Sequence, residues 1–276
     1  EMSASLVGSE MCIRDSSKIY RQAESSHIVL NAHKINAGEL ITLNNKNKDF
    51  FFFEKQDVRS VMGALIYLVK TKLPEYIGTS PFEIQVLTPM RKGELGVEHL
   101  NEVLQYYLNP ASESKKEKEG RTGVFREGDK VMQVKNNYKL EWKITNAKGF
   151  SVEEGLGVFN GDMGVIKQIN TYSERITVVF DENREVEYPY SNLDELELAY
   201  AITIHKSQGS EYPAVVLPLL SGPPILCNRN LLYTAITRAQ KCAAIVGRQS
   251  MVEQMIHNET EQKRYSGLNE CLKDGI

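Results

Sequence analysis

The hydrophobic residues of this chain follow two different periodicities, and this change constrains the fold more than any other feature. Before residue 109, stretches with helical spacing alternate with short apolar runs, and one of these runs, Glu83–Thr88, predicts a buried parallel strand. Between Gly149 and Leu196 the helical spacing disappears, and short alternating strands are separated by turn residues such as Asn160-Gly161-Asp162. The first pattern then returns. The sequence therefore predicts a parallel α/β domain with a small β-barrel inserted into it.

The same changes of pattern set the domain boundaries that we predict. They are a non-native or disordered tail at residues 1–16, the first part of the α/β domain at 17–148, the barrel at 149–196 and the second part of the α/β domain at 197–276. The tail has no clear periodicity and lacks the layout of a signal peptide. It is similar to a translated sequencing adaptor, and in that case we expect the gene to continue upstream.

Composition and charge narrow the function classes. The chain has 33 basic and 36 acidic residues, so bulk charge gives no support for nucleic-acid binding, although local clusters decide contacts to phosphate. No cysteine belongs to a CxxC pair or has a histidine at zinc spacing, which favours a reducing cytoplasm and no metal site for Cys12, Cys227, Cys242 and Cys271. No apolar run approaches the roughly 18–20 residues that a membrane helix needs, so we expect no membrane partner.

The strongest cluster of polar residues is Ala201–Glu211, with the sequence AITIHKSQGSE. It places a polar turn at the carboxyl end of a predicted parallel strand, where open α/β sheets bind ligands. Gly209 allows close backbone approach or a positive φ, Lys206 and the hydroxyls suit phosphate, and Glu211 can accept from a ribose hydroxyl. Residue types alone do not distinguish such a site from a solvated polar loop.

Three further segments carry candidate residues. In Leu231–Lys241 (LLYTAITRAQK), Arg238 lies near the end of a predicted helix, where it either caps carbonyls or reaches a phosphate across a domain interface. Arg21 precedes another predicted helix. In VLTPMRKG, Thr88 ends a predicted strand and Arg91 follows it. Taken singly, each of these side chains also fits an ordinary surface or structural residue.

Together and in this order, the four segments resemble the second motor half of superfamily 1 helicases, specifically the RecD-like branch. TIHKSQGSE is similar to helicase motif V, LLYTAITRAQK to motif VI, and Tyr20-Arg21-Gln22 to the arginine motif of this branch. VLTPMRKGELGVEHLN is similar to the strand and helix that meet single-stranded DNA, and the predicted barrel to the SH3-like insertion. The resemblance covers about Ser17 to Gly247 and implies a RecA-like fold for the α/β domain.

The resemblance also implies roles for individual residues. Arg21 and Arg238 would reach the γ-phosphate of ATP, and an arginine finger of this kind contributes a factor of roughly 10³–10⁵ to the rate. The nucleotide would also be met by Gln22, Gln208, Gly209 and Glu211. Single-stranded DNA would be met by Thr88, Arg91, Thr203, His205, Lys206 and Ser207, through phosphates and base stacking without sequence preference.

One departure from the family pattern limits what this chain is expected to do alone. Neither GxxxxGKS nor GxxxxGKT occurs in the sequence, and no acidic strand end resembles the second motif of the family. The phosphate cradle and the Mg²⁺ ligands are therefore expected in a first motor domain upstream. We expect ATP and Mg²⁺ to serve the full enzyme, which by resemblance moves 5′ to 3′, and no measurable ATPase from this chain by itself.

Two other interpretations stay open at this point. The chain can be the helicase half of a conjugative relaxase, which requires an upstream nicking domain. It can also be a non-catalytic nucleic-acid- or protein-binding module in which the barrel is the active part. The geometry separates this second interpretation from a motor, because a motor requires Arg21 and Arg238 to converge on one open face with Gly209 and Glu211.

Overall fold

A computed structural model describes residues 26–43, 45, 47–120, 123–146 and 150–259. Within these ranges, one sheet has five strands in the order β1-β14-β13-β2-β12, and all of its neighbouring pairs are parallel. The strands are β1 (Phe50–Glu54), β2 (Ile84–Thr88), β12 (Ala201–Thr203), β13 (Tyr212–Leu219) and β14 (Ala239–Gly247). The predicted parallel α/β domain is confirmed.

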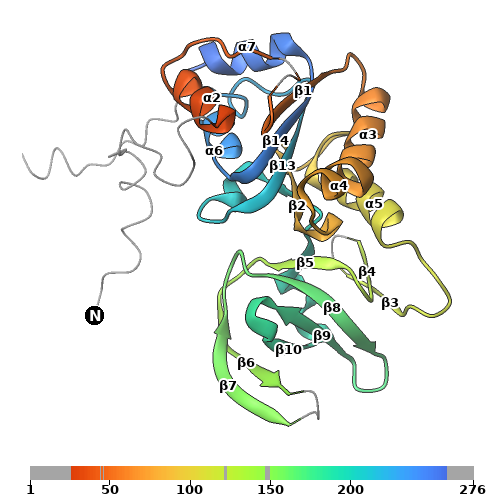
Figure 1. Cartoon of the computed structure of the whole chain (residues 1–276). Helices are drawn as coiled ribbons and strands as arrows, with labels where there is room; N and C mark the ends of the chain where they lie inside the picture. Colours follow the sequence, from red (N-terminus) through yellow and green to blue (C-terminus); the bar gives the residue numbers. More distant parts are fainter. Residues whose placement is uncertain (1–25, 44, 46, 121–122, 147–149, 260–276) are drawn as a thin grey trace, which may run out of the picture.

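Helices cover both faces of this parallel sheet (Figure 1). One face packs against α2 (His27–Asn36), α6 (Arg229–Ile236) and α7 (Gln249–His257), and the other against α3 (Val58–Tyr67) and α5 (Val97–Leu108). A π-helical turn (Leu68–Lys72) continues α3 into α4 (Leu73–Ile77). Because both faces are covered, successive residues of β13 are buried on opposite sides, Val215 with α2 and α6 and Val216 with α3 and α5.

An antiparallel sheet lies below the parallel sheet in Figure 1. In the described part of the chain it has seven strands in the order β11-β5-β8-β9-β10-β6-β7. They are β5 (Lys130–Gln133), β6 (Asn137–Thr145), β7 (Ser151–Val158), β8 (Met163–Asn170), β9 (Arg175–Phe180), β10 (Glu185–Pro189) and β11 (Leu196–Leu198), beside a small hairpin of β3 (Glu117–Glu119) and β4 (Val124–Arg126). This sheet is the predicted SH3-like insertion.

The antiparallel sheet begins at Lys130, whereas the predicted barrel begins at Gly149. Two of its strands, β6 and β7, carry few buried residues, so the alternation that marks β8, β9 and β10 is weak in them. Gly149 itself lies outside the described residues. In the sheet, β6 pairs with β7, the next strand along the chain, and with β10, which is distant in the sequence.

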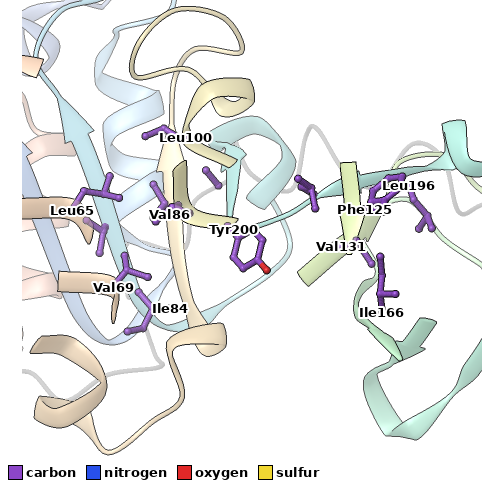
Figure 2. Packing of buried hydrophobic residues seen from close by; sticks show 14 of the residues in the cluster. Leu65, Val69, Ile84, Val86, Leu100, Phe125, Val131, Ile166, Leu196 and Tyr200 are labelled. Atoms are coloured by element: carbon purple, nitrogen blue, oxygen red, sulfur yellow. The ribbon is translucent and has the colours of Figure 1, made fainter. Parts of the chain in front are cut away.

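A continuous hydrophobic cluster joins the two sheets (Figure 2). Val86 and Leu100 belong to the α/β side, Val131 and Ile166 belong to the antiparallel sheet, and the ring of Tyr200 lies between them. The Tyr200 ring also faces Phe82, with ring centroids 6.0 Å apart. Burial of this apolar surface fixes the insertion against the α/β domain.

Buried polar groups reinforce this junction. The carboxylate of Asp129 is fully buried and accepts hydrogen bonds from Tyr200 Oη at 2.9 Å, Gln105 Nε2 at 2.6 Å and Asn109 Nδ2 at 2.7 Å. Burial raises the pKa of Asp129, although these hydrogen bonds act in the opposite direction. A buried carboxylate with several donors specifies one geometry, because each donor would lose its partner if the junction shifted.

Lys130, the next residue, is buried in the same junction. Its Nζ atom donates to Phe82 O at 2.7 Å and to Gln85 Oε1 at 2.9 Å. Burial lowers the pKa of Lys130 to about 8, because the charged ammonium has lost its water. Gln85 in turn donates to the carbonyls of Ala199 and Tyr200, at 3.1 Å each. The two ends of the insertion, near Lys130 and Tyr200, are thus tied together beneath the parallel sheet.

Candidate functional site

Two of the predicted site loops begin side by side at the carboxyl edge of the parallel sheet. Strands β2 and β12 are parallel neighbours, and their register pairs Thr88 with Thr203. The chain after Thr203 forms the 3₁₀ turn Ile204–Ser207 and then enters β13 at Tyr212. The two segments that carry the predicted DNA contacts therefore begin at one edge of the sheet, where open α/β sheets bind ligands.

The loop after β12 exposes some of its polar side chains and uses another to fix its own turn. His205 and Gln208 are exposed, and Gly209 has a φ of +88° with open space where a Cβ atom would lie. The hydroxyl of Thr203 accepts a hydrogen bond from Lys206 N at 3.4 Å and so begins the 3₁₀ turn. The loop therefore offers an imidazole, an amide and an unobstructed backbone to the exterior.

Arg238 connects the end of α6 to this loop. Its Nη1 atom donates to Ser210 O at 3.2 Å, and its Nε atom donates to Thr234 O, in α6, at 3.3 Å. Tyr212 N donates to Arg238 O at 2.9 Å, so the backbones are joined as well. The Arg238 guanidinium thus caps carbonyls in this structure and also lies directly beside the residues around Ser210.

Glu211 completes this cluster, since its Oε2 atom accepts from Gln240 Nε2 at 3.4 Å. Because Arg238 bonds to Ser210 O, its guanidinium lies close to the two chain neighbours of Ser210, Gly209 and Glu211. The other predicted arginine, Arg21, lies outside the described residues together with Gln22. The helix that follows them, α2, packs against α6, the helix that carries Arg238. The expected convergence of the two guanidiniums remains a prediction.

Two predicted DNA contacts need correction. The side chains of Thr88 and Ser207 are completely buried. The Thr88 hydroxyl donates to Leu95 O at 2.7 Å, and the Ser207 hydroxyl donates to Ile204 O at 2.7 Å. Both hydroxyls satisfy backbone carbonyls inside their own loops, so they shape these loops and present no surface to a DNA strand.

Arg91 and Lys206 lie at the same edge and share a residue that the sequence analysis did not identify. Glu197, in β11, accepts from Arg91 Nη2 at 2.6 Å and from Lys206 Nζ at 3.0 Å. Burial opposes ionisation of Glu197, but the hydrogen bonds from Arg91 and Lys206 outweigh it and lower the pKa of this carboxyl. The hydrogen bond to Glu197 raises the pKa of Arg91.

The sequence contains half of the signal for Glu197. The run Leu196-Glu197-Leu198 alternates, and both leucines are buried in the structure, so the glutamate has to point to the opposite face of β11. What this face contacts depends on how β11 docks beside the loop after β12. Periodicity contains no such information.

No group of three or more His, Cys, Asp or Glu side chains is arranged to hold a metal ion in the part of the chain that the structure describes. Within the same ranges, no helix combines the length and apolar character needed to cross a bilayer.

Two protein families match separate parts of this chain. Residues 100–180 match the family described as "ATP-dependent RecD-like DNA helicase SH3 domain". Residues 198–246 match the family described as "UvrD-like helicase C-terminal domain". The first match covers most of the antiparallel sheet. The second contains Arg238 and the whole loop around Gly209.

Individual relatives agree with these families. The ATP-dependent RecD2 DNA helicase of Deinococcus radiodurans is 34% identical over 223 residues, which cover 81% of this chain and 27% of that protein. The RecBCD enzyme subunit RecD of Mycolicibacterium smegmatis is 30% identical over 191 residues, which cover 69% of this chain and 29% of that protein. The chain thus spans less than a third of the length of either relative.

Among solved structures, the Pif1 helicase from Bacteroides in complex with ADP-AlF3 and ssDNA superimposes with a TM-score of 0.48 at 18% identity, covering 94% of this chain and 56% of that chain. The sequence relatives and the two family matches carry the assignment. This chain belongs to the RecD-like branch of superfamily 1 helicases, in which it corresponds to the C-terminal portion with its SH3 domain.

Proposed function

We propose that this chain is the second motor half of a 5′ to 3′ ATP-dependent DNA helicase, supplying Arg238 to the nucleotide and part of the track for single-stranded DNA. The observation that carries the proposal is the bond of the Arg238 guanidinium to Ser210 O, at 3.2 Å. This bond brings an arginine to the loop of Gly209 and Glu211. Homology to ATP-dependent DNA helicases supports the assignment.

The three residues have chemistry that suits a nucleotide. Gly209 has no Cβ atom and has open space around it, so a phosphate can approach its backbone closely. The Glu211 carboxylate can accept a hydrogen bond from a ribose hydroxyl. Arg238 would exchange a neutral carbonyl partner for a phosphate oxygen, which forms a stronger, charge-assisted hydrogen bond.

The residues of this chain do not fit the Mg²⁺ that accompanies ATP. The sequence contains no GxxxxGKS or GxxxxGKT segment, and the described residues contain no acidic group arranged for a metal. We propose that a P-loop domain outside this chain holds the ion and the remaining phosphate contacts, and that ATP turnover requires both halves.

The track for single-stranded DNA would be formed by the exposed face of the two loops at the carboxyl edge. Lys206 and Arg91 provide cations there, His205 provides an exposed ring, and Thr203 fixes the start of the 3₁₀ turn. Phosphate neutralisation combined with stacking gives binding that tolerates any base sequence. Such binding is expected in a protein that moves along a strand.

Binding of a fluorescent oligo-dT to the purified chain tests the DNA part of this proposal. We expect measurable binding at low salt and a weaker complex with Lys206→Ala. The salt slope, which is the slope of log affinity against log salt concentration, should be smaller by about 0.7 in this variant because one phosphate contact is lost. Lys167→Ala is the matched control, since Lys167 is also paired with a glutamate, at 2.6 Å, but lies on the antiparallel sheet. Equal losses in both variants, or no binding by the wild type, would contradict the track and favour a protein-binding module.

Phosphate release tests the ATP part. We expect no turnover above background from the chain with ATP, Mg²⁺ and oligo-dT, since the phosphate cradle is missing from the sequence. Turnover that disappears in Arg238→Ala would show that this chain hydrolyses ATP without a second half, and would overturn the proposed division of labour.

A further inference from the structure

One carboxylate lies between the two cations of the proposed DNA track. Glu197 Oε1 accepts from Arg91 Nη2 at 2.6 Å, and Glu197 Oε2 accepts from Lys206 Nζ at 3.0 Å and from Arg91 Nη1 at 3.5 Å. Arg91 and Lys206 belong to different loops of the parallel sheet. Glu197 comes from neither loop, because β11 pairs with β5 in the antiparallel sheet.

The carboxylate is more protected from water than the cations that it contacts. The side chain of Glu197 is 17% exposed, compared with 27% for Lys206 and 44% for Arg91. A carboxylate in such a position is weakly screened, and the hydrogen bonds from both cations favour its ionised form, while both cations stay partly exposed. Arg91 also contacts Glu98 Oε1 at 3.3 Å, so two negative charges oppose two positive charges here.

A DNA phosphate that approaches Arg91 and Lys206 therefore meets two cations whose charge is already balanced. The phosphate must share their donors with Glu197 or displace it, and it is repelled by the carboxylate at close range. The favourable release of counterions from the strand is also smaller where the protein supplies its own anion.

We propose that Glu197 is a positioning residue that limits the strength of the grip on single-stranded DNA, acting as an internal competitor of the DNA phosphate. The inference rests on the proposed function, because it assumes that Arg91 and Lys206 contact the strand. It assigns a role in that contact to the SH3-like insertion, which supplies the carboxylate. A moderate grip suits a motor that has to release the strand in every cycle.

Glu197→Gln tests this inference, because glutamine keeps the shape of the side chain and removes its charge. In the oligo-dT assay we expect the affinity to rise about 3- to 10-fold at low salt, as one repulsive charge within several ångström disappears. The salt slope should become steeper by roughly 0.7 if one further phosphate is neutralised. A role limited to stability would leave this slope unchanged.

Two other variants calibrate the result. Glu187→Gln removes the same charge from a carboxylate that also contacts two cations, Arg175 at 3.0 Å and Lys143 at 3.7 Å, within the antiparallel sheet. We expect it to bind oligo-dT like the wild type. Glu98→Gln should give a smaller gain in affinity than Glu197→Gln. Glu98 is 41% exposed, and of the two cations it contacts Arg91 and not Lys206.

The outcomes separate this inference from the proposed function. An affinity of Glu197→Gln that is equal to or below that of the wild type overturns the inference, and so does an equal gain in Glu187→Gln. If Glu197→Gln fails to fold, as shown by its unfolding temperature, Glu98→Gln decides by its gain or lack of gain. Failure of the proposed track would instead appear as a wild type that does not bind oligo-dT, or as a Lys206→Ala variant that binds it no more weakly than Lys167→Ala does.

Discussion

The central strand β13 and the edge strand β7 are equally long but lie in opposite environments. In β13, which has neighbours on both sides and helices on both faces, only Pro213 is not buried. In β7, at the end of the antiparallel sheet, Val152 and Leu156 remain 68% and 65% exposed. The comparison indicates that the parallel sheet forms the deeply buried support of the site, whereas the insertion contributes its junction and the Glu197 carboxylate.

The largest expected effect tests the contrast between these two strands directly. Leu217→Ala in β13 should reduce the free energy of unfolding by about 3–5 kcal/mol, because it leaves a cavity in a fully buried position. Leu156→Ala in β7 should change it by less than about 0.5 kcal/mol. Urea denaturation followed by circular dichroism gives both values. Similar losses in the two variants would show that the edge strand is as important for stability as the central one.

An intermediate effect is expected at the junction between the sheets. Asp129→Asn should reduce the free energy of unfolding by roughly 2–4 kcal/mol, since the new amide places donors against the donors of Gln105, Asn109 and Tyr200. Asp194→Asn, in an exposed ion pair with Lys135, is the control and should cost less than about 1 kcal/mol. A neutral result for Asp129→Asn would mean that the apolar cluster alone holds the insertion.

The smallest effect concerns the pH dependence of stability. Folding lowers the pKa of Lys130 from 10.5 to about 8, so between these pH values the unfolded chain binds a proton that the folded chain lacks. Stability from this residue therefore rises with pH across that window, by about 1–3 kcal/mol. Lys130→Met should lose this rise, and the difference between the two proteins isolates it from other titrating groups. If the stability of both proteins depended on pH in the same way from 8 to 10.5, the Lys130 ammonium would be solvated in the folded protein, which contradicts its burial.

Much of the fold followed from local pattern. Glu83–Thr88 and Ala214–Leu219 are apolar runs without helical spacing, and both form central strands of the parallel sheet. The antiparallel pattern was recognisable in β8, β9 and β10, where buried and exposed residues alternate. It was not recognisable in β6 and β7, because strands with little buried surface leave no periodic signal.

The candidate site divides in the same way. The resemblance assigned Gly209 and Arg238 to the nucleotide and Lys206 to DNA, and the structure places Arg238 beside the loop that carries the other two. Thr88 and Ser207 were assigned to DNA through the resemblance and carry hydroxyls that suit phosphate, but both hydroxyls are buried and bond to the backbone. A hydroxyl serves a loop carbonyl as readily as a phosphate, so residue type does not separate the two roles.

The sequence by itself determined the alternation of strands and helices in the α/β domain and the loops that carry polar residues, because both depend on neighbouring residues. The order of its motifs along the chain indicated the family. The tertiary structure alone decided that Glu197 meets Arg91 and Lys206, since these residues come from three separate segments. It also decided that Asp129 and Lys130 close the junction between the sheets. Such contacts depend on how packed elements approach one another, and a local sequence pattern carries no information about the distance between elements.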